Sequence, residues 1–340
     1  MKKGLLVLLL VLGMLLTACA AQPPQTAASP DASTTTAPQT EPTQPEEEEV
    51  TNLFAELYPK DNNVPDKKYM SQVVEELADG IRGHITEVTY TWKNGKVSME
   101  VLGGVRDHYT VLTPPEEDPI QRVTGESEFY NYLLYLPEGY DPDDTETKWP
   151  VIFFFHGIGE SGDDLEMLTR YGMPKYLLDG GKVDAIMIAP QCPGDSHWAD
   201  TDAEEEKLVQ FVPEMAQKYN IDTNRMYLTG LSMGGRCTWK LALAMPDTFA
   251  AIAVVCGRTN TYEFDTINDM PIWMFHGVKD PTVSYDNVNK IVPLLIENDH
   301  CYFKLTAYPY GKHDVWTETY AKTELYEWLL SQSLTAKDNG

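Results

Sequence analysis

The run Val151-Ile152-Phe153-Phe154-Phe155 limits the possible folds of this chain more than any other segment. A strand with one face in water alternates apolar and polar side chains, whereas this run has no polar member. Short runs that are apolar throughout are typical of strands covered on both faces, and such strands occur mainly in parallel sheets flanked by helices. The run therefore predicts a parallel or mostly parallel sheet with a helical layer on each side.

Further apolar runs alternate with amphipathic segments from about residue 127 onward, which is typical of an α/β domain. The predicted strands are 129–136, 151–155, 185–189, 226–229, 251–255, 272–275 and 302–307. The predicted helices are 164–178, 203–219, 234–244, 286–298 and 315–330. We expect these elements to form one α/β domain over residues 127–332.

Residues 51–126 have a different pattern. The segment 69–77 predicts a short helix, and the segments 85–92 and 96–102 alternate in hydrophobicity. Lys93-Asn94-Gly95 between those segments is typical of a hairpin turn. The sequence predicts a small β-containing N-terminal unit here. It is either a separate module, with a possible adhesion or assembly role, or a set of strands added to an antiparallel edge of the main sheet.

The first residues have the pattern of an export signal. Two lysines precede an apolar run at 5–16 that is too short to span a bilayer as a mature helix. The run ends in Leu16-Thr17-Ala18-Cys19, which resembles the lipobox of bacterial lipoproteins. The resemblance implies removal of residues 1–18 and lipid attachment to Cys19. The alternative is an ordinary signal peptide with an incidental cysteine.

The segment 19–50 predicts a disordered tether. Residues 20–49 contain only Ala, Gln, Pro, Thr, Ser, Asp and Glu, and so they offer no apolar surface to bury. A tether of this kind holds a folded domain away from a membrane surface. With the lipobox, it predicts a lipid-anchored protein on the extracellular face of a bacterial membrane.

The charge balance excludes one class of partner. The chain has 52 acidic and 26 basic residues, a formal net charge of −26. Nucleic-acid binding requires a basic surface, which this composition does not favour. Anionic lipid headgroups are disfavoured for the same reason, so we expect membrane contact only through Cys19.

The most informative motif is Gly230-Leu231-Ser232-Met233-Gly234, which follows an apolar strand and precedes a helical segment. A serine between two glycines at a strand-to-helix turn is a nucleophile elbow, in which the turn exposes the hydroxyl above the sheet. The start of the following helix places backbone N–H donors where negative charge develops during acyl transfer. The motif predicts Ser232 as a nucleophile.

A serine nucleophile needs a base and an orienting carboxylate, and in this context they follow in the order Asp, then His. Asp280 comes in the loop after the predicted strand 272–275, and His313 comes after the last predicted strand. Taken singly, Asp280 could be a turn residue and His313 a surface histidine. Their order and their places at strand ends favour a catalytic pair, with His276 ordering the loop of Asp280 by a hydrogen bond.

The remaining requirement is an oxyanion hole. The loop His156-Gly157-Ile158 follows the strand 151–155, the position from which one backbone donor is supplied in such folds. We predict the backbone N–H groups of Ile158 and Met233 as the donors, and His156 as the residue that holds the loop. The sequence contains no CxxC motif and no His/Cys cluster, so neither a metal nor a cofactor is expected.

Residues 127–331 resemble the α/β-hydrolases, and specifically the secreted esterase and prolyl-oligopeptidase-like group. That group includes feruloyl esterases, acetyl xylan esterases and polyhydroxybutyrate depolymerases. The segments that carry the resemblance are 132–140, 150–162, 189–193 with Trp198, 230–235 and the loops of Asp280 and His313. The resemblance implies an α/β-hydrolase fold. It also implies a pocket-lining role for Trp198, with loop packing as an equal alternative, and a substrate contact for Gln191.

These features predict a carboxylic ester hydrolase that works by acyl transfer to Ser232. An enzyme outside the cell suits a substrate too large to import, such as a feruloylated or acetylated plant polysaccharide. One alternative is a prolyl-oligopeptidase-like serine peptidase, although residues 51–126 are too few for the large propeller that such peptidases usually carry. The other is a non-catalytic surface binding protein on a hydrolase scaffold.

Overall fold

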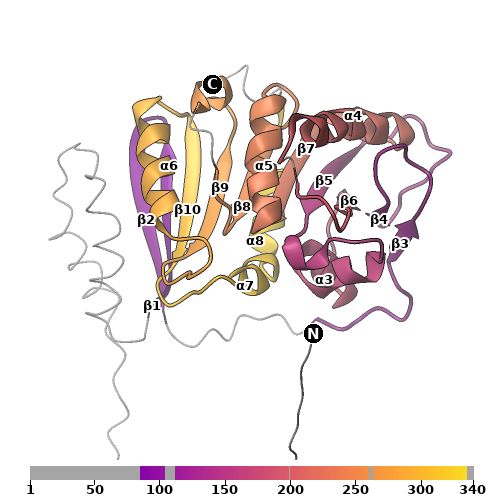
Figure 1. Ribbon diagram of the computed structural model, residues 1–340, viewed down its shortest axis with the longest axis horizontal. Coiled ribbons are helices and arrows are strands. Elements are labelled where there is room, and N and C mark those ends of the chain that lie inside the picture. The colour runs from indigo at the N-terminus through magenta and orange to yellow at the C-terminus, as the bar shows by residue number, and fades with distance from the viewer. Residues whose placement is uncertain (1–84, 104–111, 199, 260–262, 335–340) are drawn as a thin grey trace, which may run out of the picture. The chain divides into compact units, whose positions relative to one another are not determined.

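A computed structural model describes residues 85–103, 112–198, 200–259 and 263–334 (Figure 1). The predictions for residues 1–18, for the tether at 19–50 with Cys19, and for a helix at 69–77 lie outside these residues. Within the described ranges, no helix has the length and apolar character needed to cross a membrane.

The described residues form one sheet in the order β2-β1-β10-β9-β8-β7-β5-β6-β4-β3. The strands are β1 (Ile85–Lys93), β2 (Lys96–Gly103), β3 (Ile120–Val123), β4 (Tyr132–Tyr135), β5 (Trp149–Phe155), β6 (Ile186–Pro190), β7 (Ile221–Leu231), β8 (Ala251–Val255), β9 (Ile272–Gly277) and β10 (Tyr302–Tyr308). The strands from β10 to β6 in this order are parallel, and the strands outside them at both ends are antiparallel. The predicted mostly parallel sheet is confirmed.

Helices flank this sheet, with α5 and α6 in front of it and α8 behind it in Figure 1. The helical elements are η1 (Ile158–Glu160), η2 (Leu165–Arg170), α3 (Gly172–Leu178), α4 (Asp202–Lys218), α5 (Met233–Ala244), η3 (Phe264–Ile267), α6 (Asp286–Glu297), α7 (Trp316–Tyr320) and α8 (Thr323–Leu330). This arrangement of a mixed sheet between helices is the α/β-hydrolase fold.

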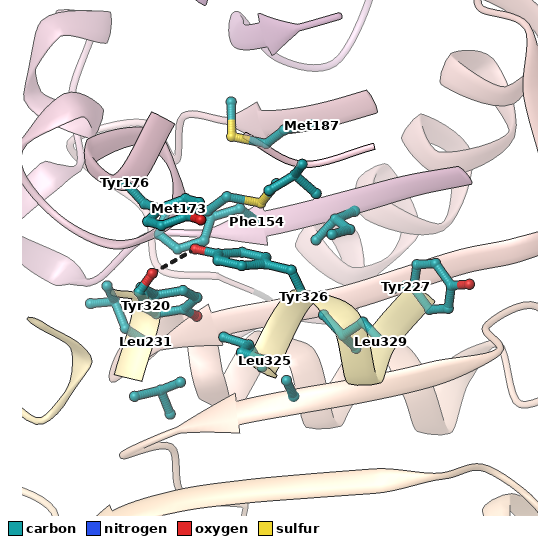
Figure 2. Close-up of a cluster of buried hydrophobic side chains, with 14 of the residues drawn as sticks. Phe154, Met173, Tyr176, Met187, Tyr227, Leu231, Tyr320, Leu325, Tyr326 and Leu329 are labelled. Atoms are coloured by element: carbon teal, nitrogen blue, oxygen red, sulfur yellow. Dashed lines mark hydrogen bonds between the residues drawn. The ribbon is translucent and has the colours of Figure 1, made fainter. Parts of the chain in front are cut away.

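The apolar run in β5 shows why both faces need helices. Phe154 packs edge-on against Tyr320 of α7, in the cluster that α3, α7 and α8 form on one face (Figure 2). Phe153 and Phe155 point to the opposite face, where they contact Phe211 of α4 and Trp198. Alternate residues of an all-apolar strand are thus buried on opposite sides of the sheet.

Two predicted helices are each broken in the structure. The predicted helix 164–178 divides into η2 and α3 because Gly172 adopts a φ of 70° and packs closely on Phe154. A Cβ at Gly172 would lie 2.2 Å from the Phe154 ring. The predicted helix 315–330 divides at Lys322, which is extended and sends its ammonium to the buried carboxylate of Glu87 on β1 and to the Tyr308 hydroxyl.

The strands of the predicted N-terminal unit join the main sheet. β1 pairs antiparallel with β10, the last strand among the described residues, and the Thr89 and Thr306 hydroxyls hydrogen-bond across that pair at 2.8 Å. β3, which precedes the expected boundary at residue 127, pairs antiparallel with β4, which follows it. Of the two alternatives for this unit, the described residues adopt the one in which strands extend the sheet.

Candidate active site

Ser232 lies between β7 and α5 with a backbone φ of 54° and ψ of −113°. Such a conformation costs a non-glycine residue roughly 1–3 kcal/mol, so the surrounding structure must hold it. The Ser232 N–H donates to the Val255 carbonyl at 2.9 Å, and the Arg236 N–H donates to the Ser232 carbonyl at 3.1 Å. Strand β8 and the first turn of α5 therefore fix the turn that presents the hydroxyl.

The two glycines of the motif allow the turn to pack directly on β5. A Cβ at Gly234 would lie 1.9 Å from the Phe155 carbonyl oxygen, and a Cβ at Gly230 would lie 2.5 Å from the Gly234 carbonyl carbon. Contacts this short leave no space for a side chain at either position. The spacing of glycines around Ser232 is thus a requirement of backbone packing at the ends of β5 and β7.

The structure brings Ser232, His313 and Asp280 together. The Ser232 hydroxyl is 2.8 Å from His313 Nε2, and His313 Nδ1 is 2.7 Å from Asp280 Oδ2. His313 lies in the loop between β10 and α7, and Asp280 lies in the loop after β9. This is the arrangement of a nucleophile, a general base and an orienting carboxylate.

Asp280 is held as a buried carboxylate. Its side chain has no exposed surface, and its Oδ1 accepts hydrogen bonds from the Thr282 N–H at 2.8 Å and the Val283 N–H at 2.9 Å. His276 Nε2 donates to the Val283 carbonyl at 2.8 Å, and burial lowers the pKa of His276. As the sequence predicts, His276 orders the loop that carries the acid.

The acid loop and the base loop are joined through their backbones. The Val278 N–H donates to the Tyr308 carbonyl and the Lys279 N–H donates to the Gly311 carbonyl, both at 3.0 Å. A Cβ at Gly277 would lie 2.2 Å from the Lys312 carbonyl oxygen. The two loops therefore touch through backbone atoms next to both Asp280 and His313.

The loop after β5 is held by the ring of His156. The Cys192 N–H donates to His156 Nε2 at 3.0 Å, so this nitrogen is unprotonated and the proton is on Nδ1. His156 Nδ1 then donates to the Gly157 carbonyl at 2.5 Å. Burial lowers the pKa of His156 to about 4. A neutral ring with both nitrogens engaged holds the loop, as the sequence predicts, and is not placed to act as a second base.

The two residues with a predicted substrate contact lie behind this loop. Trp198 is only 1% exposed, and its indole N–H donates to the His156 carbonyl at 3.1 Å. Gln191 is also buried, and its amide nitrogen donates to the Glu160 carbonyl at 2.9 Å and the Asp164 carbonyl at 2.8 Å. Of the two alternatives for Trp198, the geometry fits loop packing. The contacts of Gln191 likewise fix the loop rather than reach the serine.

The two predicted oxyanion donors border the serine. Met233 is the first residue of α5 and Ile158 is the first residue of η1, and the first N–H groups of a helix have no acceptor within it. The neighbouring Gly157 approaches so closely that a Cβ there would lie 3.8 Å from Ser232 Cβ. The roles of both N–H groups stay predictions, made on positions that suit them.

Three large apolar side chains are exposed among the described residues, and they belong to the segments that follow β5 and β10. They are Ile158 at 60%, Tyr171 at 40% and Tyr310 at 43%. Tyr171 packs edge-on against Trp316, which in turn packs edge-on against the His313 ring, with centroids 5.9 Å and 5.2 Å apart. No sequence motif singles out Tyr171 or Tyr310, although Tyr310 stands three residues before the predicted base.

The cysteines and acidic groups suggest no further chemistry at the site. Cys192, Cys237 and Cys256 are buried free thiols. Burial raises the pKa of Cys256, which stands at the end of β8 next to the Ser232 turn. Within the described ranges, no group of three His, Cys, Asp or Glu side chains is placed to hold a metal ion.

The fold and the Ser–His–Asp geometry define a serine hydrolase of the α/β-hydrolase class. Residues 194–274 match the prolyl oligopeptidase family. A probable feruloyl esterase C from Aspergillus terreus is 27% identical over 191 residues, which are 55% of this chain and 67% of that protein. A bifunctional acetylxylan esterase/xylanase from Neocallimastix patriciarum is 26% identical over 164 residues, which are 48% of this chain and only 24% of that protein.

Solved structures give the same class. The crystal structure of a thermostable esterase has a TM-score of 0.53 and 27% identity, and the match covers 70% of this chain and 68% of that one. A feruloyl esterase module from Clostridium thermocellum has a TM-score of 0.50 and 17% identity over 66% of this chain and 91% of that one, which shows the fold alone. The chain is a serine esterase with an α/β-hydrolase fold.

Proposed function

We propose that this enzyme hydrolyses feruloyl esters carried by polysaccharide, outside the cell. The observation that carries the reaction type is the hydrogen-bonded series Ser232–His313–Asp280 on a strained elbow. The name of the relatives, feruloyl esterase, supports the acyl group. The polysaccharide rests on the predicted export of the chain and on those relatives.

The geometry assigns each step of the reaction. The Ser232 hydroxyl attacks the ester carbonyl carbon while His313 Nε2 takes its proton, and Asp280 holds the other ring nitrogen and stabilises the imidazolium. His313 returns the proton to the alcohol oxygen as the C–O bond breaks. A water molecule then attacks the acyl carbon while His313 takes its proton, and His313 returns that proton to Ser232 Oγ as the acyl–serine bond breaks and the acid is released. The oxyanion accepts hydrogen bonds from the backbone N–H groups of Ile158 and Met233.

The exposed apolar side chains favour a bulky acyl group over acetyl. Ile158 lies on the loop 156–164 after β5, here called the oxyanion loop for its predicted role, and Tyr171 with Trp316 forms an aromatic pair next to the base. An aromatic acyl group covers such side chains and removes apolar surface from water, at ~25 cal/mol per Å². An acetyl group is too small to do so. Tyr171→Ala should therefore reduce kcat/KM for feruloyl esters more than for acetyl esters.

A serine peptidase is the second candidate, because residues 194–274 match the prolyl oligopeptidase family. Every strand in the described part of the chain belongs to one sheet, so these residues contain no propeller that would filter substrates by size. A site that no propeller filters among these residues suits an ester on a polymer better than a short peptide selected by size.

A substrate panel with a serine variant tests the reaction. Methyl ferulate, p-nitrophenyl acetate, a feruloylated oligosaccharide and peptide p-nitroanilides are compared, with fluorophosphonate labelling as a measure of nucleophile reactivity. We expect turnover of esters, labelling of the wild-type protein, and loss of both in Ser232→Ala at unchanged thermal stability. Faster turnover of amides than esters would favour the peptidase, and absence of labelling would favour a binding protein.

We also propose that Cys19 carries a lipid anchor that holds the enzyme at the outer surface of a bacterial membrane. The lipobox-like sequence and the Pro/Thr/Glu-rich segment after it support this. In a bacterial host, the full chain should fractionate with membranes, and Cys19→Ser should release it without changing esterase activity. Equal membrane association of the two forms would contradict the anchor.

A further inference from the structure

A cavity at the active-site edge of the sheet takes part in none of the steps above. It has a volume of about 290 Å³ and is lined by residues 127–131, Gly162, Asp163, Gln191 and Pro193. Ligand pockets usually range upward from ~300 Å³, so this one has room for a single small ring.

Strand pairing fixes the position of the cavity relative to the serine. β4 is antiparallel to β6 and pairs Tyr132 with Pro190, so the residues before β4 and after β6 emerge at the same edge of the sheet. Ser232 follows β7 at that edge, and β5 and β6 separate β7 from β4. At a strand spacing of ~4.8 Å, the cavity lies ~10–15 Å from the serine along the edge.

The walls of the cavity are rigid. The Ser127 hydroxyl donates to Glu214 at 2.7 Å and accepts the Phe129 N–H at 3.1 Å. The Gln191 N–H donates to the Asn131 carbonyl at 2.9 Å, and Gln191 also anchors the oxyanion loop. A preformed wall of this kind lowers the entropic cost of binding.

The chemistry of the lining selects a neutral polyol. Glu128 and Asp163 are exposed carboxylates, and neither has an ion-pair or hydrogen-bond partner among the residues that the structure describes. Carboxylate and amide oxygens accept hydrogen bonds from hydroxyl groups. The half-buried ring of Phe129 offers an apolar surface to the C–H face of a sugar. The two unpaired negative charges repel a phosphate or a uronate.

We propose that this cavity binds one neutral sugar residue of the glycan whose ester is positioned at Ser232. This proposal rests on the proposed function and extends it. The glycan is the alcohol part of the ester, and the cavity that binds it lies beyond the oxyanion loop from Ser232. The distance along the sheet edge is one that a short oligosaccharide spans. The enzyme thus holds its substrate at two points, the ester at the triad and a sugar at the cavity.

The test separates glycan binding from catalysis. Glu128→Gln/Asp163→Asn and Phe129→Ala alter the cavity without touching the triad or the anchors of the oxyanion loop. The matched control is Asp143→Asn/Glu146→Gln, which removes the same charges from the loop between β4 and β5 at the opposite edge of the sheet. The probes are a xylotetraose without ester, a cellotetraose, a tetragalacturonate, a feruloylated xylo-oligosaccharide and methyl ferulate. Thermal melts verify that each variant folds.

We expect the wild-type protein to bind a neutral tetrasaccharide by calorimetry and to bind tetragalacturonate at least ~10-fold more weakly. The choice between xylotetraose and cellotetraose identifies the glycan. Each cavity variant should lower kcat/KM for the feruloylated oligosaccharide by ~10-fold, with less than ~2-fold change for methyl ferulate. The control variant should leave all values unchanged.

Two results would overturn the proposal: a similar loss on both esters, or unchanged tetrasaccharide affinity and unchanged kcat/KM on the feruloylated oligosaccharide. Failure of the proposed function has a different signature, because methyl ferulate would then not be hydrolysed by the wild-type protein at all. Binding of the unesterified tetrasaccharide is measured independently of that outcome.

Discussion

Two pairs of loops surround Ser232 and are held in place by different atoms. The acid and base loops follow β9 and β10, and the other pair follows β5 and β6. The acid and base loops are joined by backbone hydrogen bonds and by the close approach of Gly277 to Lys312. The oxyanion loop is fixed by three side chains, those of His156, Gln191 and Trp198. We therefore expect added atoms to disturb the acid and base loops, and the loss of a side chain to disturb the oxyanion loop.

The largest effect on activity should come from removing the Asp280 carboxylate in the acid loop. Asp280→Asn retains an oxygen for the Thr282 and Val283 N–H groups but removes the carboxylate that orients His313. We expect kcat for methyl ferulate to fall by ~10⁴-fold with little change in stability. Asp314→Asn, at the exposed neighbour of the base, is the control. A loss under ~10-fold for Asp280→Asn would mean that another group orients the base.

An added methyl group should disrupt the contact between the acid and base loops. Gly277→Ala places a Cβ against the Lys312 carbonyl, so the acid and base loops must separate. We expect a ~10²-fold fall in kcat and ~2–4 kcal/mol lower stability by urea unfolding. Gly159→Ala in the oxyanion loop is the matched control, because no atom lies within 4 Å of the Cβ it would add. Equal effects of the two substitutions would remove the contrast between the regions.

Low pH should lower the stability of the oxyanion loop, which is held by side chains. The pKa of His156 is lowered from 6.5 to about 4, so the native ring stays neutral while the unfolded chain binds a proton below pH ~6.5. The stability that this neutral ring contributes is present above that pH and is lost as the pH falls toward 4. The unfolding free energy of the wild type should thus drop by ~3 kcal/mol more than that of His156→Gln between pH 7 and pH 4. Parallel pH curves for the two proteins would contradict a buried neutral His156.

Loss of a single amide should give the smallest effect. Gln191→Leu removes the donors to the Glu160 and Asp164 carbonyls and leaves those oxygens unpaired. We expect ~1–2 kcal/mol lower stability and a fall in kcat of up to ~10-fold, because the oxyanion loop loses its anchor. Gln210→Leu on the exposed side of α4 is the control. A wild-type kcat in Gln191→Leu would show that the loop keeps its position without this residue.

Sequence patterns predicted the central strands well because burial on both faces leaves a strong apolar signal. Residues 251–255 were predicted as a strand and form β8 with the same bounds. Helix breaks were missed, since they depend on contacts with distant residues: Gly172 packs on Phe154 and Lys322 pairs with Glu87. The strand with which the hairpin pairs cannot be predicted either, because an alternating pattern defines a half-buried strand and not its partner.

The site shows the same division. The triad residues follow from local motifs and their order along the chain, and the structure places them within hydrogen-bond distance of one another. Local motifs do not predict where the side chains of Trp198 and Gln191 lie. Their polar groups bind backbone carbonyls of a loop about thirty to forty residues away in the sequence, as the pairs Gln191–Glu160 and Trp198–His156 show. A motif cannot tell such an anchor from a substrate contact.

The pairing of β1 with β10 has a consequence for how the chain is made. Thr89 and Thr306, which hydrogen-bond across that pair, are 217 residues apart in the sequence. Strand β10 is therefore synthesised long after β1, and until then the β1–β2 hairpin has no strand of the main sheet to pair with. Because contacts this distant close slowly, the β1–β2 hairpin should be the last part of the sheet to dock during folding. A chain that stops before β10 leaves β1 paired with β2 on one edge and unpaired on the other, and exposed strand edges of this kind promote association with other chains.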